Sequence, residues 1–154
     1  MNNLYYLRNN PVIVMGVVET AIQRDGYADV GRIAALLPIL LDDRMLEVLL
    51  DTNLQYTFRQ LVQQNNMYLA NYNDRYLSLL NPFYRALSIM MDADAVKLNG
   101  AFVEQSTEKS FHLVNTGGSG NGRMKRVTEA TCRLLALTEK ESNKELYALL
   151  KVSL

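Results

Sequence analysis

The sequence predicts a mainly α-helical protein: a single compact helical domain with a small β-hairpin, winged-helix-like in the order of its elements. Apolar residues recur at helical spacing over most of the 154 residues, and cap signals separate the segments. An Asn-Gly pair near residue 100 stands between two short apolar runs, which is a hairpin signal. The chain has no repeat of solenoid length and no linker, so we expect residues 1–154 to form one domain.

The first helix begins at a clear signal. Asn10-Pro11 places asparagine at the N-cap and proline at the first helical position. Gly26 ends this helix, because glycine accepts the left-handed conformation of a C-cap. The apolar residues on its buried face are Val14, Val17, Val18, Ala21 and Ile22.

Aspartates predict the next two helix starts. Asp29 can cap a second helix that carries apolar residues as far as Leu41. Pro38 lies inside it and predicts a kink or a break. Asp42 or Asp43 can then restart the helix, which runs to about residue 50.

Three helical segments are expected in the middle of the chain. Residues 52–55, Thr-Asn-Leu-Gln, fit a capping box that opens a helix. Another helix covers about residues 67–80. Asn81-Pro82 repeats the first start signal and predicts a new helix there. The buried stripe of that helix is Phe83, Ala86, Leu87 and Met90.

The pattern changes to β structure after residue 94. Residues 96–98 and 101–103 predict two strands, and Asn99-Gly100 between them suits a type I′ turn, in which both central residues have positive φ. Residues 111–114 predict a third short strand. A helix over about 123–138 follows, and a capping box at residues 142–145 opens a last short helix.

Residues 116–122 form a glycine-rich loop that invites a nucleotide-binding interpretation. Gly117 and Gly122 have the spacing of a P-loop. Met124, however, stands where serine or threonine would ligate magnesium, and the chain after the loop is too short for an ATPase core. We therefore expect a connection after the hairpin and no nucleotide hydrolysis.

The remaining alternative for this stretch is an anion site. Arg123, Lys125 and Arg126 follow the loop, at the start of the predicted helix. Backbone amides at a helix N-terminus and these three side chains could contact a nucleic-acid backbone or an acidic protein surface.

Composition limits the classes of function. Apolar residues make up 49% of the chain and the formal net charge is zero, which fits a globular protein and argues against non-specific coating of nucleic acid. The N-terminal segment lacks the pattern of a signal peptide, and no apolar run approaches the length of a membrane span. We expect a cytoplasmic protein without membrane contact.

Tyr68, Tyr72 and Tyr76 recur at intervals of four residues, so they would form one row along a helix. Such a row can line the edge of the core with its hydroxyls in solvent. The alternative is a partner interface, because tyrosine is enriched among residues that anchor protein partners.

Catalytic chemistry has almost no support in the sequence. His112 is the single histidine, and no Cys-x-x-Cys or His-x-x-x-His spacing accompanies it. Cys132 lies beside an apolar stripe and fits an inert core thiol. The acidic pairs Asp42-Asp43 and Asp92/Asp94 are explained by capping and by a turn. We expect no enzyme activity, no cofactor and no metal.

Three blocks together resemble a known family. The first is Asn10-Pro11, which opens an apolar helix, together with the later run IAALLPILLDDRMLEVL. The second is NPFYRALSIMMDADAVKLNGAFVEQ. The third is the ending MKRVTEATCRLLALTEKESNKELYALLKVSL. In this respect the chain is similar to the middle component of bacterial three-component ABC-ATPase systems, which include Lamassu-type antiphage defence. The resemblance spans nearly the whole chain.

The resemblance implies a non-catalytic small subunit that joins an SMC/Rad50-like ABC ATPase to an effector protein, often a nuclease. DNA contact within such a complex is a further expectation. The second hypothesis is a stand-alone winged-helix DNA-binding regulator, for which the hairpin and the basic run at residues 123–126 are the motivation.

Overall fold

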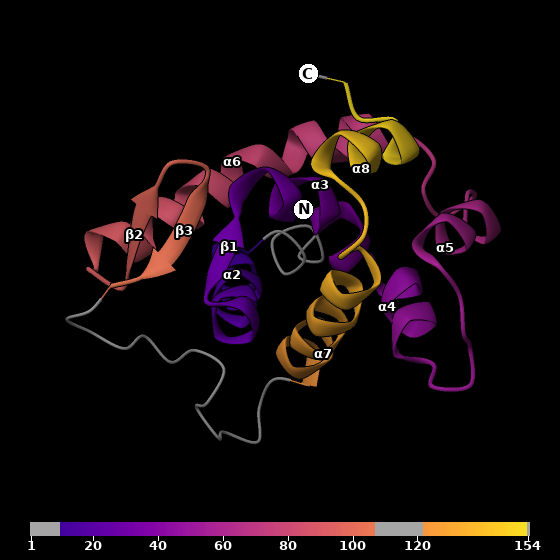
Figure 1. Cartoon of the computed structure of the whole chain (residues 1–154), viewed down its shortest axis with the longest axis horizontal. Coiled ribbons are helices and arrows are strands. Elements are labelled where there is room, and N and C mark those ends of the chain that lie inside the picture. The colour runs from indigo at the N-terminus through magenta and orange to yellow at the C-terminus, as the bar shows by residue number, and fades with distance from the viewer. Residues whose placement is uncertain (1–9, 107–121, 154) are drawn as a thin grey trace, which may run out of the picture.

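The computed structural model describes residues 10–106 and 122–153, and it confirms the predicted fold class (Figure 1). Helices make up most of the described chain, and a small antiparallel sheet lies at one end. In chain order the elements are α2 (Pro11–Asp25), β1 (Tyr27–Asp29), α3 (Val30–Leu40), α4 (Asp43–Leu50), α5 (Phe58–Gln64), α6 (Tyr72–Asp92), β2 (Val96–Asn99), β3 (Phe102–Gln105), α7 (Gly122–Leu137) and α8 (Asn143–Leu150).

Helix α2 lies at the centre of the core. Every residue from Ile13 to Ile22 is buried, so neighbours must cover this helix on several sides. Helices α6 and α7 are its main helical neighbours. Gly16 permits the close approach of α7, because a Cβ at this position would lie 2.5 Å from the sulfur of Met124.

The predicted starts of the first helices are confirmed. The Asn10 side chain accepts a hydrogen bond from the amide of Val12, and Gly26 ends α2 with a φ of 83°. Asp29 and Asp42 cap α3 and α4 in the same way. The break predicted at Pro38 does not occur, because α3 continues through this proline to Leu40.

The three-stranded sheet has the order β1-β3-β2. The register pairs Ala28 with Val103 and Leu98 with Val103, so these side chains share one face. Ala28 and Val103 are buried, and this face packs on α2. Strand β1 was not predicted, because three residues are too few to show an alternating pattern.

The hairpin is confirmed, but its predicted turn is wrong by one residue. Asn99 pairs with Phe102, which leaves Gly100 and Ala101 at the tip. Only Gly100 has a positive φ there, 63°, so the turn is not type I′. The predicted strand at residues 111–114 and most of the loop at 116–122 lie outside the described residues, as does His112.

Two predicted helix starts are wrong. Helix α5 begins at Phe58, where Thr57 and Gln60 form the capping box, and residues 52–55 precede it without helical structure. Helix α6 runs through Pro82 without a break. Buried Leu79 and Phe83 lie on either side of this proline in one stripe, and packing of that stripe against α2 and α3 outweighs the lost backbone hydrogen bond.

The order of elements is that of winged-helix domains. Strand β1 follows the first described helix and pairs with the last strand of the hairpin, and α6 directly precedes that hairpin. In this arrangement α6 occupies the place of the helix that enters the major groove in winged-helix DNA-binding proteins. Helices α4 and α5 are additional elements between α3 and α6.

A polar clamp joins the start of α3 to the turn between α7 and α8. The Arg32 guanidinium donates hydrogen bonds to the carbonyls of Thr138, at 2.6 Å, and of Glu141. Asn143 donates to the carboxylate of Asp29, and Tyr147 donates to the carbonyl of Gly31. These contacts fix the C-terminal helix against the first half of the chain.

Candidate interaction surfaces

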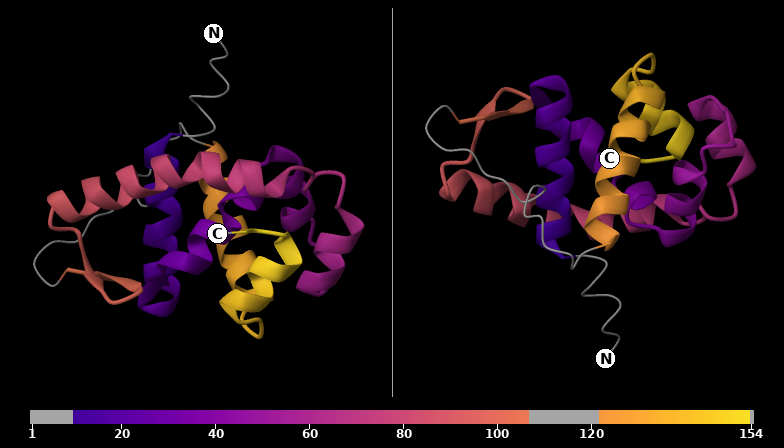
Figure 2. Two further views of the ribbon diagram at one scale, coloured as in Figure 1. Left: turned by 90° about the horizontal axis from the view of Figure 1, so that it is seen from above. Right: turned by 90° about the horizontal axis from the view of Figure 1, so that it is seen from below.

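Helix α6 presents one long side to solvent, and it lies along the surface over its whole length in the left view of Figure 2. Leu77, Tyr84 and Met91 are exposed on this side, with exposed fractions of 49%, 55% and 36%. They are seven residues apart, so they form a row along the helix that drifts by only about 20° per repeat. We call these three residues the α6 row.

The side chains beside the α6 row carry little charge. Asn81 and Ser88 are exposed next to it, and the charged residues on the exposed side are Asp74, Arg85 and Asp92. The helix that would enter a DNA groove in this fold therefore presents one cation and two anions. A surface of this kind is suited to protein contact better than to a phosphate backbone.

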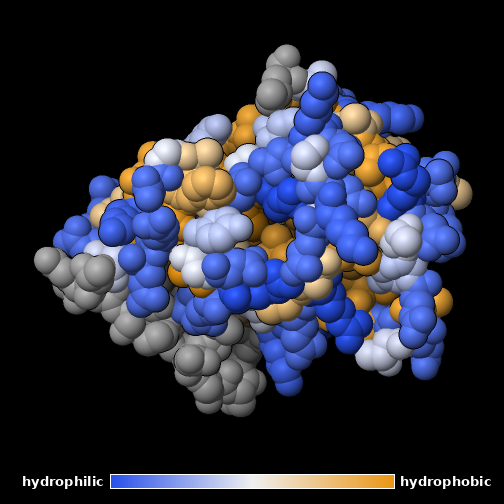
Figure 3. All heavy atoms as spheres, viewed as in Figure 1, coloured by the Kyte–Doolittle hydropathy of each residue, from blue (hydrophilic) through white to orange (hydrophobic). Residues whose placement is uncertain are grey.

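A second exposed apolar feature lies on the outer face of the sheet. The rings of Tyr27 and Phe102 pack edge to face with centroids 5.1 Å apart, and both are partly exposed. They adjoin a cavity of about 360 Å³ that is also lined by Arg24, Arg32 and Glu139. Figure 3 shows hydrophobic atoms at the floor of a hollow on this face of the molecule.

The basic run at residues 123–126 does not form one patch. Arg123 and Lys125 are two residues apart on α7, which places them on nearly opposite sides of the helix. Arg123 is half-buried, donates a hydrogen bond to the carbonyl of Leu41 and forms an ion pair with Asp43. Lys125 and Arg126 are exposed, so they are the two predicted anion contacts that a ligand can reach.

The three tyrosines do not form one exposed row, and the prediction of a partner interface at Tyr68, Tyr72 and Tyr76 is wrong for the buried Tyr72 and Tyr76. Tyr68 precedes α6 and lies in turn structure. Tyr72 and Tyr76 are each only 4% exposed. Burial raises the pKa of Tyr72 far above its ordinary value, and its protonated hydroxyl donates to the carbonyl of Ala35. Tyr76 packs near the ring of Tyr147.

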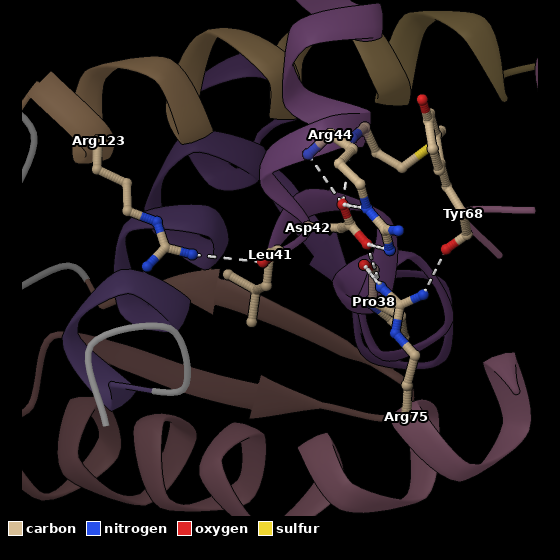
Figure 4. A network of polar contacts seen from close by, with 8 residues as sticks. Pro38, Leu41, Asp42, Arg44, Tyr68, Arg75 and Arg123 are labelled. Carbon is tan, nitrogen blue, oxygen red and sulfur yellow. Dashed lines mark hydrogen bonds and ion pairs between the residues drawn. The ribbon is translucent and has the colours of Figure 1, made fainter. Parts of the chain in front are cut away.

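Asp42 is the centre of a polar network at the junction of α3 and α4 (Figure 4). Its side chain is 8% exposed. One carboxylate oxygen accepts from the backbone amides of Arg44 and Met45, which caps α4. The guanidinium of Arg44 binds both carboxylate oxygens, and Arg75 donates to one of them at 3.0 Å.

The Asp42 network also fixes the start of α6. Arg75, in the first turn of that helix, donates to the carbonyls of Pro38 and Tyr68. The guanidinium of Arg44 lies 4.7 Å from the centre of the Tyr68 ring, a cation–π contact. The cations of this network are therefore engaged within the fold, and its function is to join α3, α4 and α6.

Burial acts to raise the pKa of the Asp42 carboxyl, but hydrogen bonds from Arg44 and the charges of Arg75 and Arg44 outweigh it. The net pKa is below its ordinary value, so this carboxylate stays ionised at neutral pH.

Two other kinds of site are absent from residues 10–106 and 122–153. No cluster of three or more His, Cys, Asp or Glu side chains is arranged to hold a metal ion. None of the helices in this part of the chain has the length and apolar character needed to cross a membrane.

Compared with protein families, with curated proteins and with solved structures, the chain has no significant match.

The α6 row was missed at the level of sequence, although its signal was present. Leu77, Tyr84 and Met91 have heptad spacing, but the predicted helix start at Asn81-Pro82 divided them between two helices. The aromatic pair was missed because Tyr27 and Phe102 become neighbours only through the pairing of β1 with β3.

Proposed function

We propose that the chain is a non-catalytic adaptor subunit of a cytoplasmic prokaryotic antiphage defence complex. In this complex it joins an SMC/Rad50-like ABC ATPase to an effector protein, often a nuclease. The observation that carries the proposal is the exposed side of α6, which has a row of apolar residues and a single exposed cation at the place where a winged-helix DNA-binding protein would present several cations.

The family resemblance supports the same assignment. It covers the blocks that form most of α3 with α4, the second half of α6 with the hairpin, and α7 with α8. The second block includes Tyr84 and Met91, two of the three residues of the α6 row. ATP hydrolysis and DNA cleavage would belong to the partner subunits.

Co-expression with the ATPase and effector of the neighbouring genes tests this proposal. We expect an affinity tag on this chain to retain both partners, and the effector to remain with the ATPase only when this chain is present. The purified chain alone should neither hydrolyse ATP nor cut DNA. Failure to retain the ATPase, or an ATPase–effector complex that forms equally well without this chain, would contradict the proposal.

The second candidate is a stand-alone winged-helix DNA-binding protein, which the order of the elements and the exposed pair Lys125 and Arg126 favour. If these two side chains bind phosphates, changing both to alanine should weaken DNA binding and reduce the slope of log K against log salt by about 2. Fluorescence anisotropy over a salt series measures this slope.

A matched control for the DNA test is the pair Lys140→Ala and Lys144→Ala, which removes two exposed cations near the turn between α7 and α8. This control should leave the slope unchanged. If the parent, the Lys125 and Arg126 variant and this control all give the same slope of log K against log salt, the phosphate site at Lys125 and Arg126 is excluded.

A further inference from the structure

We infer that the α6 row binds a single α-helix of a different polypeptide, whose apolar face is accompanied by an acidic residue opposite Arg85. The inference rests on the proposed function only in taking this helix from a partner subunit. Its basis is the geometry and charge of one helix surface, which the following observations describe.

The spacing of the α6 row is suited to a helical partner. Leu77, Tyr84 and Met91 extend over about 21 Å of helix, the length of four turns. A partner helix that crosses at a shallow angle meets residues seven apart on the same side, as in a coiled coil. An extended strand or a small ligand would not use a row of this length and period.

The residues next to the row allow a helix to come close. Asn81 and Ser88 are exposed and have shorter side chains than the row residues, so they leave room for a partner helix beside the row. Tyr84, at the middle of the row, is the most exposed of the three and packs against the buried ring of Phe83. A large aromatic at the centre of an interface is the usual position of a binding hot spot.

The charges beside the row specify the partner further. Asp74, Arg85 and Asp92 lie on the same flank, so the order of charge along α6 is negative, positive, negative. The complementary helix carries an acidic residue near its middle and basic residues toward both ends of the contact. Such charges at the edge of an interface mainly decide which partner and which register is accepted.

The same pattern disfavours a second copy of this chain as the occupant. An antiparallel pair centred near Tyr84 would bring Asp74 close to Asp92 and Arg85 close to Arg85, so like charges oppose it. In a parallel pair the charged flank of each helix would face the other flank of its partner, which carries no charged residue, so these charges would add no attraction. A different protein with complementary charges therefore fits the row better.

Photo-crosslinking tests the occupant. The variant Tyr84→p-benzoylphenylalanine is co-expressed with the ATPase and effector, irradiated, and the crosslinked site is mapped by mass spectrometry. We expect the crosslink to fall on a helical segment of another polypeptide with apolar residues at heptad spacing. The control carries p-benzoylphenylalanine at Leu54, which is 50% exposed in the segment between α4 and α5 and should give no such product.

Charge reversal then tests the register. We expect Arg85→Glu to weaken binding of the mapped partner at least tenfold, and reversal of the acidic residue that lies opposite to restore it. Arg59→Glu makes the same change on α5 and should leave binding unchanged. Because Arg85 is exposed, thermal unfolding of the Arg85→Glu variant should match that of the parent.

Four results would overturn the inference: a crosslink to a second copy of this chain, no product above that of the Leu54 control, a mapped segment without an acidic residue opposite Arg85, or unchanged binding by Arg85→Glu. If the ATPase is retained but any of these results is found, this inference fails and the proposed function stands. If the row crosslinks to a helix of some other protein and the ATPase is not retained, the proposed function fails instead.

Discussion

Replacing Asp42 with alanine should lower the free energy of unfolding by about 3 kcal/mol. The variant loses the cap of α4, and it removes the acceptor that Arg44 and Arg75 share. Arg75 keeps its bonds to the carbonyls of Pro38 and Tyr68 but is left without a carboxylate in a half-buried position. Urea unfolding followed by circular dichroism measures the change.

Two further variants separate the contributions of Asp42. Asp42→Asn keeps a good N-cap but removes the charge and one of the two acceptor oxygens, so its loss of stability should lie between those of the parent and of Asp42→Ala. Asp43→Ala removes the adjacent, more exposed carboxylate, and it should cost less than about 1 kcal/mol. Equal losses for Asp42→Ala and Asp43→Ala would contradict the central position of Asp42 in this network.

The contacts of the Asp42 carboxylate with Arg44 and Arg75 also predict how stability depends on pH. The pKa of Asp42 is lower in the folded chain than its ordinary value, so the stabilisation is complete above that ordinary value, near pH 4. It is lost as the pH falls further, through the pKa of the folded state. We therefore expect the difference in stability between the parent and Asp42→Asn to shrink below about pH 4, as measured by unfolding from pH 7 to pH 2.

The helix starts that the sequence predicted well are those decided by local contacts. Asn10, Asp29, Asp42 and Ser142 each accept from an amide two or three residues further along, and no distant part of the chain is needed. Residues 52–55 have a suitable pattern but form no helix, because a second capping box at Thr57 and Gln60 lies immediately before the buried side chains Phe58 and Leu61.

Errors in predicting the sites have a different origin. The continuity of α6 through Pro82 depends on packing against α2 and α3, which no local signal reports. Once α6 is continuous, its buried and exposed sides are fixed over five turns. Tyr72 and Tyr76 then belong to the core, and Leu77 and Tyr84 belong to the surface. The candidate interface is therefore rotated by about 100° around the helix axis from the predicted one, because adjacent residues such as Tyr76 and Leu77 differ by that angle.

Arg123 illustrates the limit of a basic run as a sign of nucleic-acid contact. Four neighbouring residues on a helix point in different directions, and the nearest acidic or carbonyl group decides what each cation meets. For Arg123 those groups are Asp43 and the carbonyl of Leu41, which lie 80 and 82 residues away in sequence. Only Lys125 and Arg126 keep the accessibility that the original prediction required.

Replacing Arg32 with alanine should have an effect as large as that of Asp42→Ala, about 3 kcal/mol, at the opposite end of α3. Its guanidinium donates to the carbonyls of Thr138 and Glu141, just past the end of α7, and the Thr138 carbonyl also accepts from the amide of Glu141. Without Arg32, these two partly buried carbonyls lose a charged donor, and α8 loses a connection to α3. Urea unfolding and the hydrogen exchange of α8 amides measure the two consequences.

The matched control for Arg32→Ala is Arg24→Ala, because Arg24 also reaches the turn after α7, through an ion pair with Glu139. That carboxylate is well exposed, so the pair should contribute less than about 1 kcal/mol. Arg32→Lys can retain one of the two carbonyl contacts and should fall between Arg32→Ala and the parent. Equal losses for Arg24→Ala and Arg32→Ala would show that surface charge, and not the pair of carbonyl contacts, holds α8 in place.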